Sequence, residues 1–309
     1  MKAALCFCVL MTAFSAAVGN PAKKWGLFSR HYRSGRPTEL ARCIDQVQVE
    51  GTYRYISTGE SDPGLCSIYI LSPPDKIIEI DVQEMNIDCN GGLIGLLDGW
   101  ELNQEVFPGW LDGSKSREER LKFFCGESGP SKPVVSSQNL INIKHRIPNL
   151  GEGFTFTVRF IDNPEPCNVL LMEPTGAYTL QNFGKARNCS VSILHPEKVN
   201  ILGVDIGSTI DGKHHKSMGV RRQCMESGER DYAEFLFGSG MQPDYMRLGD
   251  NDMCGTKHEV GSLILLPCGY SVVRLVSSGQ YVNSISFRFD RVTDDEFVEL
   301  AAMGHTFQC

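Results

Sequence analysis

Ten cysteines constrain this chain more than any other feature of its sequence. The chain contains 12 cysteines, of which Cys6 and Cys8 lie in an N-terminal stretch with the pattern of a secretory leader. The remaining ten would reach an oxidising compartment, where an even number of cysteines indicates disulfides rather than free thiols. We therefore expect five disulfides among the following positions: Cys43, Cys66, Cys89, Cys125, Cys167, Cys189, Cys224, Cys254, Cys268 and Cys309.

The leader, a signal peptide, is predicted over residues 1–19. Lys2 supplies a positive start, residues 3–17 an apolar stretch, and residues 17–19 a cleavage site with small side chains. This apolar stretch is shorter than the roughly 20 residues that span a membrane, and no other segment approaches that length. We therefore expect a secreted, extracellular protein with no membrane partner.

Residues 20–42 form a basic segment ahead of an acidic chain. They contain six lysines and arginines and one glutamate, whereas the whole chain has a formal net charge of -7 at pH 7. The acidic balance argues against nucleic acid as a partner, because binding to phosphates requires positive charge. The basic segment itself could be a contact surface, a propeptide or a solvated tail.

Short runs of alternating apolar and polar residues dominate the chain beyond residue 42. Residues 154–160 place four large apolar side chains on one face and two threonines and an arginine on the other, and residues 284–289 repeat this pattern. Such alternation, broken by glycine, proline and asparagine turns, indicates an all-β fold of antiparallel sandwiches. Only two short helices are expected, at the capping boxes Ser116–Glu119 and Thr293–Glu296.

A cysteine, a turn, an apolar strand and a second turn occur twice in the chain. The first copy is Ile87–Trp100, and a weaker copy runs over Cys224–Gly240. The intervals between successive cysteines also alternate short, long, short, long. We therefore predict two tandem modules, residues 43–162 and 163–309, whose boundary lies at Asp162–Pro166, because two prolines there forbid a continuing sheet.

The repeat also bears on how the cysteines pair. Ten cysteines allow on the order of 900 connectivities, but two copies of one module favour pairing in sequence order. The last pair has no counterpart in the first module and would attach the C-terminal tail to the second. Each closed loop would contribute roughly 3–4 kcal/mol in the chain-entropy model. The pairs favoured are Cys43–Cys66, Cys89–Cys125, Cys167–Cys189, Cys224–Cys254 and Cys268–Cys309.

Several motifs resemble catalytic or metal sites, and a structural interpretation fits each better. Cys125–Pro130 resembles the nucleophile loop of trypsin-like proteases, but it lacks the second glycine and no histidine motif precedes it. Val204–Thr209 resembles phosphate-binding and aspartic-protease loops, yet it has no partner carboxylate in a second such loop. The lysines of Lys213–Lys216 repel a cation from its two histidines, and His258-Glu259 lacks the second histidine of a zinc-protease helix. We expect no enzyme, no metal and no cofactor.

One N-glycosylation sequon is present, Asn188-Cys189-Ser190. Such a sequon indicates a surface position in a secreted protein, here in the second module. Its middle cysteine can slow the modification if the disulfide closes first. We expect a glycan at Asn188.

Together, these residues resemble the family of corticotropin-releasing factor-binding proteins. The resemblance runs from about Arg42 to Phe289 and includes all ten cysteines outside the leader. No single motif identifies the family, but the motifs taken together are specific to it. The motifs are Ile87-Asp88-Cys89-Asn90-Gly91-Gly92, Asp98-Gly99-Trp100, Phe107-Pro108, Ser136-Ser137-Gln138-Asn139, Pro166-Cys167-Asn168-Val169, Asn188-Cys189-Ser190 and Val273-Arg274-Leu275-Val276-Ser277-Ser278-Gly279.

The resemblance implies a secreted glycoprotein of two CUB-like modules that sequesters peptide hormones of the corticotropin-releasing factor and urocortin type and has no catalytic activity. In the family, ligand contacts include the region of the first mature cysteine, with an aspartate two residues after it and an arginine four residues before it. Asp45 matches the aspartate, but Glu39 stands at the arginine position. We propose Arg36 and Arg42 as its substitutes.

Two other classes of function remain open, a CUB-type extracellular adaptor and an inactive or unrecognised protease. The adaptor could bind a partner through calcium. Calcium-binding CUB modules resemble this chain in Asp98 and in the Ser-x-Asn loop Ser137–Asn139. They also carry an acid shortly after the cysteine, where this chain has Leu93, which offers no oxygen. Because calcium needs several oxygen ligands, we expect no metal at this position.

Overall fold

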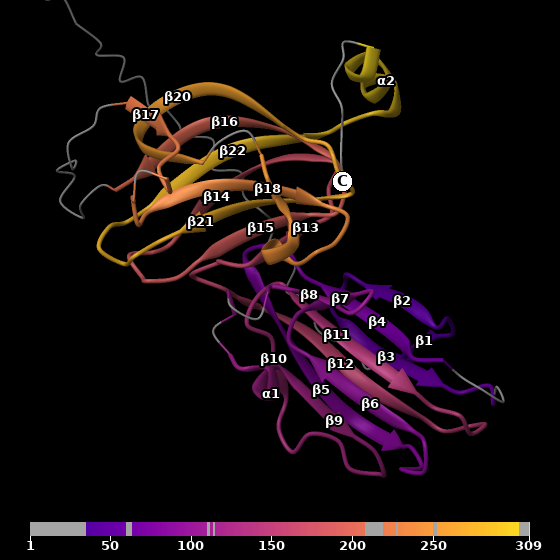
Figure 1. Cartoon of the computed structure of the whole chain (residues 1–309). Helices are drawn as coiled ribbons and strands as arrows, with labels where there is room; N and C mark the ends of the chain where they lie inside the picture. The colour runs from indigo at the N-terminus through magenta and orange to yellow at the C-terminus, as the bar shows by residue number, and fades with distance from the viewer. Residues whose placement is uncertain are drawn as a thin grey trace, which may run out of the picture. The chain divides into compact units, whose positions relative to one another are not determined.

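The strands between Thr38 and Arg291 form two β-sandwiches within one compact unit, residues 36–309 (Figure 1). The predicted leader, residues 20–34 of the basic segment and the Lys213–Lys216 motif lie outside the described residues. No helix in the described part is long and apolar enough to cross a membrane. The computed structural model describes residues 35–59, 64–109, 112–113, 115–207, 219–226, 228–249, 252–302 and 309.

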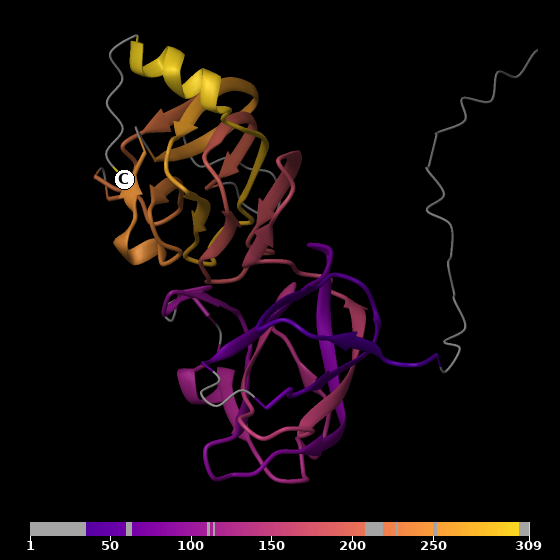
Figure 2. The same ribbon diagram turned by 90° about the vertical axis from the view of Figure 1, so that its right-hand side faces the viewer.

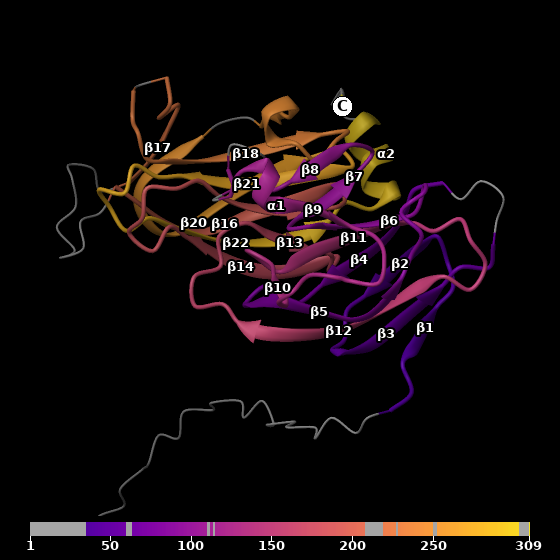
Figure 3. The ribbon, with the colours of Figure 1, turned by 90° about the horizontal axis from the view of Figure 1, so that it is seen from below.

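The first sandwich consists of two five-stranded sheets (Figure 3). A hairpin and the helix α1 (Arg117–Arg120) lie outside these sheets, and the hairpin is formed by β7 (Trp100–Leu102) and β8 (Glu105–Phe107). One sheet has the spatial order β1 (Thr38–Leu40), β3 (Gly51–Ile56), β12 (Gly153–Asp162), β5 (Lys76–Asn86) and β10 (Val134–Val135). The other has the order β2 (Ile44–Val47), β4 (Cys66–Leu71), β11 (Leu140–Arg146), β6 (Leu93–Leu97) and β9 (Leu121–Phe124).

The end of the basic segment is part of this sandwich. β1 pairs in parallel with β3, with Glu39 opposite Arg54. Residues 38–40 are therefore an edge strand and not a solvated tail, which was one of the alternatives that the sequence left open.

Alternating side chains place β12 at the centre of the first core. Phe154, Phe156 and Val158 are buried, as the sequence pattern predicts, and pack with isoleucines from β4, β5 and β11. Thr157 points to the opposite face, where its Oγ1 lies 3.1 Å from Oγ1 of Thr52 on the neighbouring strand. The two hydroxyls satisfy each other, so the outer face of this sheet can remain polar.

The second sandwich is one curled sheet (Figure 2). β20 pairs with both β18 and β16 and thereby connects the two layers. The register of β16 shifts between Ile201 and Gly203 against both neighbours, and such irregularities bend a strand. The main strands follow in the order β13 (Val169–Leu171), β15 (Cys189–Ile193), β21 (Tyr270–Val276), β18 (Tyr232–Gly238), β20 (Met253–Leu266), β16 (Glu197–Ile206), β22 (Ser284–Arg291) and β14 (Thr175–Gln181).

Both expected helix starts are confirmed, one in each half, and a few smaller elements complete the second half. Ser116 caps α1 through a capping box with Glu119. Thr293, directly before α2, and Glu296 in its first turn exchange the equivalent hydrogen bonds. The remaining elements are β17 (Gly219–Arg222), the 3-10 helix η1 (Pro243–Tyr245), β19 (Arg247–Leu248) and α2 (Asp294–Ala302). The prediction of an all-β fold with two sandwiches and a C-terminal helix is confirmed.

Five disulfides join the ten cysteines in sequence order, as the internal repeat predicts. The paired positions are separated by 23, 36, 22, 30 and 41 residues along the chain. The last disulfide attaches Cys309 to Cys268, directly after β20. The C-terminus is thus tied to the second sandwich.

Three strand pairs are parallel within the otherwise antiparallel sandwiches that the sequence predicts. β1 pairs in parallel with β3, β2 with β4, and β13 with β15. Two of these pairs begin at a disulfide, Cys43–Cys66 and Cys167–Cys189, and their strand registers keep the same offset as the bonded cysteines, 23 and 22 residues. The covalent bond therefore sets a parallel register that alternation alone cannot reveal.

The two halves contact each other through a buried apolar cluster and through backbone hydrogen bonds. Asn139 donates its Nδ2 to the Leu170 carbonyl and accepts the Leu170 N–H, at 2.9 and 3.1 Å. The Glu105 carboxylate, at the start of β8, accepts backbone N–H groups of Met241 and Gln242. The buried cluster contains Tyr69, Leu71, Trp100, Phe107 and Leu140 of the first half and Leu170 and Met241 of the second.

A buried ion-pair network spans the same boundary. Arg274 on β21 bonds to Asp112 of the first half and, at 2.9 Å, to Glu234 of its own half. The side chains of Asp112 and Glu234 are only 2% and 8% exposed. Burial lowers the pKa of Arg274, but its two carboxylate partners outweigh this and hold the pKa above its usual value. The guanidinium thus stays charged between two buried acids.

We predict that Arg274→Met lowers the free energy of unfolding by about 3–5 kcal/mol, because it leaves two buried carboxylates without their cation. Chemical denaturation of the purified variant measures this loss. Arg288→Met is the matched control, since Arg288 pairs with Asp290 on an exposed strand face and its loss should cost less than about 1 kcal/mol. Equal effects of the two substitutions would contradict the role of Arg274.

Candidate functional site

Asp45 points into the end of the first sandwich. It lies on β2 opposite Ile68, and β2 alternates exposed and buried positions, with Asp45 and Val47 buried. Its carboxylate accepts the backbone N–H of Arg42 at 3.1 Å and the Arg42 Nε–H at 2.8 Å. The Asp45 side chain is 8% exposed and that of Arg42 is 77% exposed. Asp45 therefore holds the guanidinium in place and leaves it facing solvent.

The structure brings together two of the three residues that the sequence analysis selected. Arg42 and Asp45 form one ion pair. Arg36 is exposed and precedes β1, and no hydrogen bond within the described residues joins it to that pair. Glu39, at the family's arginine position, is also exposed.

Exposed apolar side chains surround the start and end of β2. Ile44 is 65% exposed, Val49 67% and Leu65 58%. Leu65 precedes Cys66, which is bonded to Cys43 between Arg42 and Ile44, so Leu65 and Ile44 lie next to this disulfide at the start of β2, whereas Val49 follows its end. The sequence analysis missed them. One signal was available in the sequence. The alternation along β2 assigns Ile44 to the outer face, where a large apolar side chain is exposed.

His145 lies under this corner of the sandwich. It is buried, its ring centroid lies 4.2 Å from that of Tyr55, and neither ring nitrogen has a hydrogen-bond partner within the described residues. Burial lowers its pKa from 6.5 to about 4, and the nearby Asp45 carboxylate only partly opposes this shift. The imidazole is therefore neutral at physiological pH.

Asp98 is the centre of a second polar site, where calcium-binding modules would carry an ion. Its carboxylate accepts the Ser137 N–H and hydroxyl at 2.7 and 2.6 Å, and the Lys115 ammonium bonds to it at 2.7 Å. The amide of Asn139, the third residue of the expected loop, is used in bonds to Ser72 and Leu170. Leu93 offers no side-chain oxygen, so these residues do not fit calcium. No group of three or more histidine, cysteine or acidic side chains that could hold a metal occurs among the described residues.

The second half contains a similar pair of hydrogen bonds between an aspartate and a serine. Asp231 accepts the Ser278 N–H at 2.9 Å and the Ser278 hydroxyl at 2.6 Å, as Asp98 does from Ser137. Instead of an ammonium, the amide of Asn283 donates to Asp231 at 2.7 Å. Asp98 follows β6 and Ser137 precedes β11, whereas Asp231 precedes β18 and Ser278 follows β21, so the two sites lie at opposite ends of corresponding strands.

The protease-like motif has no catalytic geometry. Gly126 exchanges backbone hydrogen bonds with Ile87 beside the Cys89–Cys125 disulfide, which makes the motif a turn. Ser128 is exposed, and no hydrogen bond in the described part of the chain joins it to a histidine.

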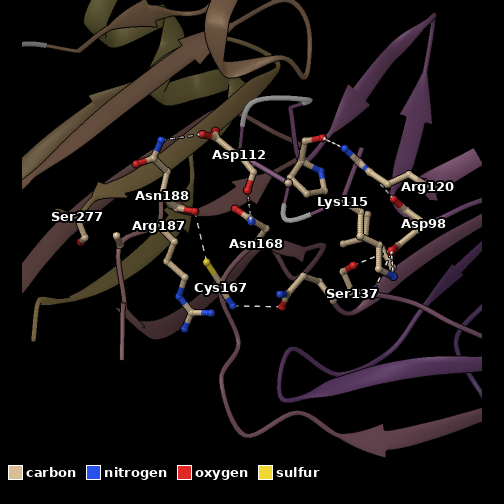
Figure 4. Close-up of a pocket in the computed structure, with 16 residues that line it drawn as sticks. Asp98, Asp112, Lys115, Arg120, Ser137, Cys167, Asn168, Arg187, Asn188 and Ser277 are labelled. Atoms are coloured by element: carbon tan, nitrogen blue, oxygen red, sulfur yellow. Dashed lines mark hydrogen bonds and ion pairs between the residues drawn. The ribbon is translucent and has the colours of Figure 1, made fainter. Parts of the chain in front are cut away.

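A cavity of about 460 Å³ lies where the two halves meet (Figure 4). Arg120, at the end of α1, donates to the Asp98 and Pro108 carbonyls at 2.9 and 3.1 Å along one wall. The sequon residue Asn188 lies on the opposite wall, beside Asp112. Its other labelled lining residues are Lys115, Ser137, Cys167, Asn168, Arg187 and Ser277.

The fold and its covalent bonds define a disulfide-bonded protein of two tandem β-sandwiches, and comparisons with known proteins specify its family. The N-terminal and C-terminal domain models of corticotropin-releasing factor binding protein match residues 36–162 and 169–298. The corticotropin-releasing factor-binding protein of Xenopus laevis is 32% identical over 258 residues, 81% of this chain and 76% of that protein. The Homo sapiens protein of that name is 34% identical over 250 residues, 80% and 74% of the two chains. This chain belongs to the corticotropin-releasing factor-binding protein family.

Solved structures give only a distant likeness. The CUB1-EGF-CUB2 domains of rat MASP-1 align with a TM-score of 0.28 and 12% identity, over 80% of this chain and 99% of that chain. The full extracellular region of zebrafish Gpr126/Adgrg6 aligns with a TM-score of 0.28 and 10% identity, over 84% and 38%. These scores add nothing to the family assignment.

We predict that His145 makes the first sandwich sensitive to acid. The unfolded chain takes up a proton near pH 6.5 and the folded chain only near pH 4, so folding stability falls as the pH drops through this window. His145→Phe removes the titration, and the variant should lose less stability than the parent between pH 6.5 and 4 in denaturation experiments. Parallel pH profiles for the two proteins would contradict this assignment.

Proposed function

We propose that this chain is a secreted carrier that binds and sequesters peptide hormones of the corticotropin-releasing factor and urocortin type, and so limits activation of their receptors. The family supports the class of ligand, because the relatives are named for binding corticotropin-releasing factor. The leader pattern at residues 1–19 and the five disulfides support secretion, since disulfides persist in oxidising compartments. The proposed domains are residues 43–162 and 163–309.

The observation that carries this proposal is that β2 is an edge strand with exposed apolar side chains at both ends. It is the edge of its sheet and pairs only with β4 within the described residues. An extended peptide can add to such an edge, and a helical one can lay its apolar face over neighbouring exposed side chains. Ile44, Val49 and Leu65 provide that apolar surface.

We assign the positive charge of the proposed binding surface to two exposed arginines, Arg42 before β2 and Arg36 before β1 of the other sheet. Arg42 is fixed by Asp45, and Arg36 lies a few residues before it, ahead of β1. Acidic side chains of a peptide would meet these cations, which would set the register of the peptide and raise its rate of encounter. In this arrangement Asp45 acts as a positioning residue, because its carboxylate is already occupied by Arg42.

We predict that Asp45→Ala and Arg42→Ala each weaken binding of synthetic corticotropin-releasing factor by roughly fivefold to tenfold, equivalent to about 1 kcal/mol. The double variant should bind no more weakly than either single variant, because both remove the same oriented guanidinium. Titration of the purified proteins measures the affinities, and thermal unfolding confirms that they are folded.

Arg159→Ala is the matched control. Arg159 is an exposed arginine of the same half, and it pairs with Glu79. Both residues lie on the sheet that does not contain β2, so removal of Arg159 should leave the affinity unchanged. Additive losses of affinity in the double variant would show that Asp45 contributes to binding independently of Arg42. Unchanged affinity in both single variants would remove the pair from the binding surface.

Chelation separates the carrier from a calcium-dependent adaptor. We predict that excess chelator leaves peptide affinity unchanged, because the Lys115 ammonium occupies the Asp98 carboxylate where an ion would bind. A titration with and without chelator tests this, and a large loss of affinity would restore the adaptor. Hydrolysis of the offered peptide during the same experiment would instead support an enzyme.

A further inference from the structure

The glycosylation sequon faces the other half of the molecule. Asn188 directly precedes β15, is only partly exposed and lines the cavity between the halves. Its Nδ2 donates to Asp112 Oδ1 over 3.0 Å, as the dashed line in Figure 4 marks. A glycan on this nitrogen would therefore begin at the cavity and not on the open surface that a sequon ordinarily indicates.

The chemistry of the amide allows both the sugar and the bond to Asp112. A side-chain amide nitrogen carries two hydrogens. Attachment of a sugar replaces one of them, and the other remains available to the Asp112 carboxylate. Modification of Asn188 is thus compatible with the contact between the halves.

The cavity suits a neutral, hydroxyl-rich occupant better than an anion. Its volume of about 460 Å³ is within the range of small-molecule sites, roughly 300–1,000 Å³. Among the described residues, three cations line the cavity. The ammonium of Lys115 is bonded to Asp98, and Arg120 donates to the Asp98 and Pro108 carbonyls. Arg187 donates to the Asn182 carbonyl and lies 3.6 Å from Glu165. Because these cations already have protein partners, the walls offer mainly amides, hydroxyls and carbonyls, the groups that bind a sugar.

The third sequon residue indicates when the sugar is attached. Ser190 is fully buried in β15, and its hydroxyl has no hydrogen-bond partner within the described residues. The transferase must reach this hydroxyl, so it has to act before β15 is buried and before Cys189 bonds to Cys167. The glycan would therefore be present when the two halves dock.

We propose that the first N-acetylglucosamine of a glycan on Asn188 occupies the cavity between the two sandwiches and forms part of their interface. Its hydroxyl and acetamide groups bond to the polar walls, while the outer sugars leave through the open side. The glycan is then a structural component of the contact between the halves. The proposal rests on the secretion included in the proposed function, but not on hormone binding.

Ser190→Ala tests the proposal without disturbing the protein contacts. The substitution removes the sequon but keeps the Asn188–Asp112 hydrogen bond, and the lost hydroxyl has no partner whose bond would be broken. Expressed through a secretory pathway, the variant should unfold a few degrees below the glycosylated protein in thermal scans. An unchanged midpoint would overturn the proposal.

Enzymatic trimming locates the stabilising sugar. An endoglycosidase that cuts after the first N-acetylglucosamine should leave the unfolding midpoint of the glycoprotein unchanged. An amidase that cuts at Asn188 itself should act on the native protein at least roughly tenfold more slowly than on the denatured one, because access requires local opening. Equal rates on native and denatured protein would place the first sugar outside the cavity.

A relocated glycan distinguishes packing from a general effect of glycosylation. In the Ser190→Ala background, Asp88→Ser creates a sequon at Asn86, an exposed position at the end of β5. A glycan there should not restore the lost stability, and restoration would contradict the proposal. Unsubstituted protein that is secreted and folded without a sugar on Asn188 would also overturn the proposal. Peptide titration of the same samples shows separately whether hormone binding is retained.

Discussion

The disulfides that begin the parallel strand pairs are the constraint on which both sandwiches depend. Cys43–Cys66 aligns β2 with β4, and Cys167–Cys189 aligns β13 with β15. In each half the bond fixes the register of an edge strand that otherwise has few hydrogen bonds. The Asp45–Arg42 pair lies beside the first of these bonds and the sequon beside the second. The proposed hormone surface and the proposed glycan thus lie at equivalent places of the two modules.

Sequence patterns predict most of the architecture because they report local periodicity and repetition. The alternation around Phe156 identifies a core strand, and the repeated order of cysteines identifies five disulfides, all of which the structure contains. Parallel pairing was not predictable from alternation, which is the same in parallel and antiparallel edge strands. The contact of Asp112 with Arg274 was also missed, because nothing in either local sequence indicates a partner 162 residues away.

The candidate site shows a similar limit. The resemblance selected Asp45, yet only the structure distinguishes a side chain that meets a ligand from one that orients another residue. The burial of Asp45 and its two bonds to Arg42 favour the second role. The exposed Ile44 was overlooked since a single apolar residue on an edge strand carries no pattern.

The ion pair of Lys115 with Asp98 makes this part of the first module independent of the ion concentration of the medium. An ion bound from solution is held only as firmly as its free concentration allows. The ammonium on Asp98 is tethered to the same polypeptide, so its effective concentration is set by the chain and not by the medium. Dilution or ion exchange therefore does not carry this cation away from Asp98, which also accepts the backbone N–H of Ser137.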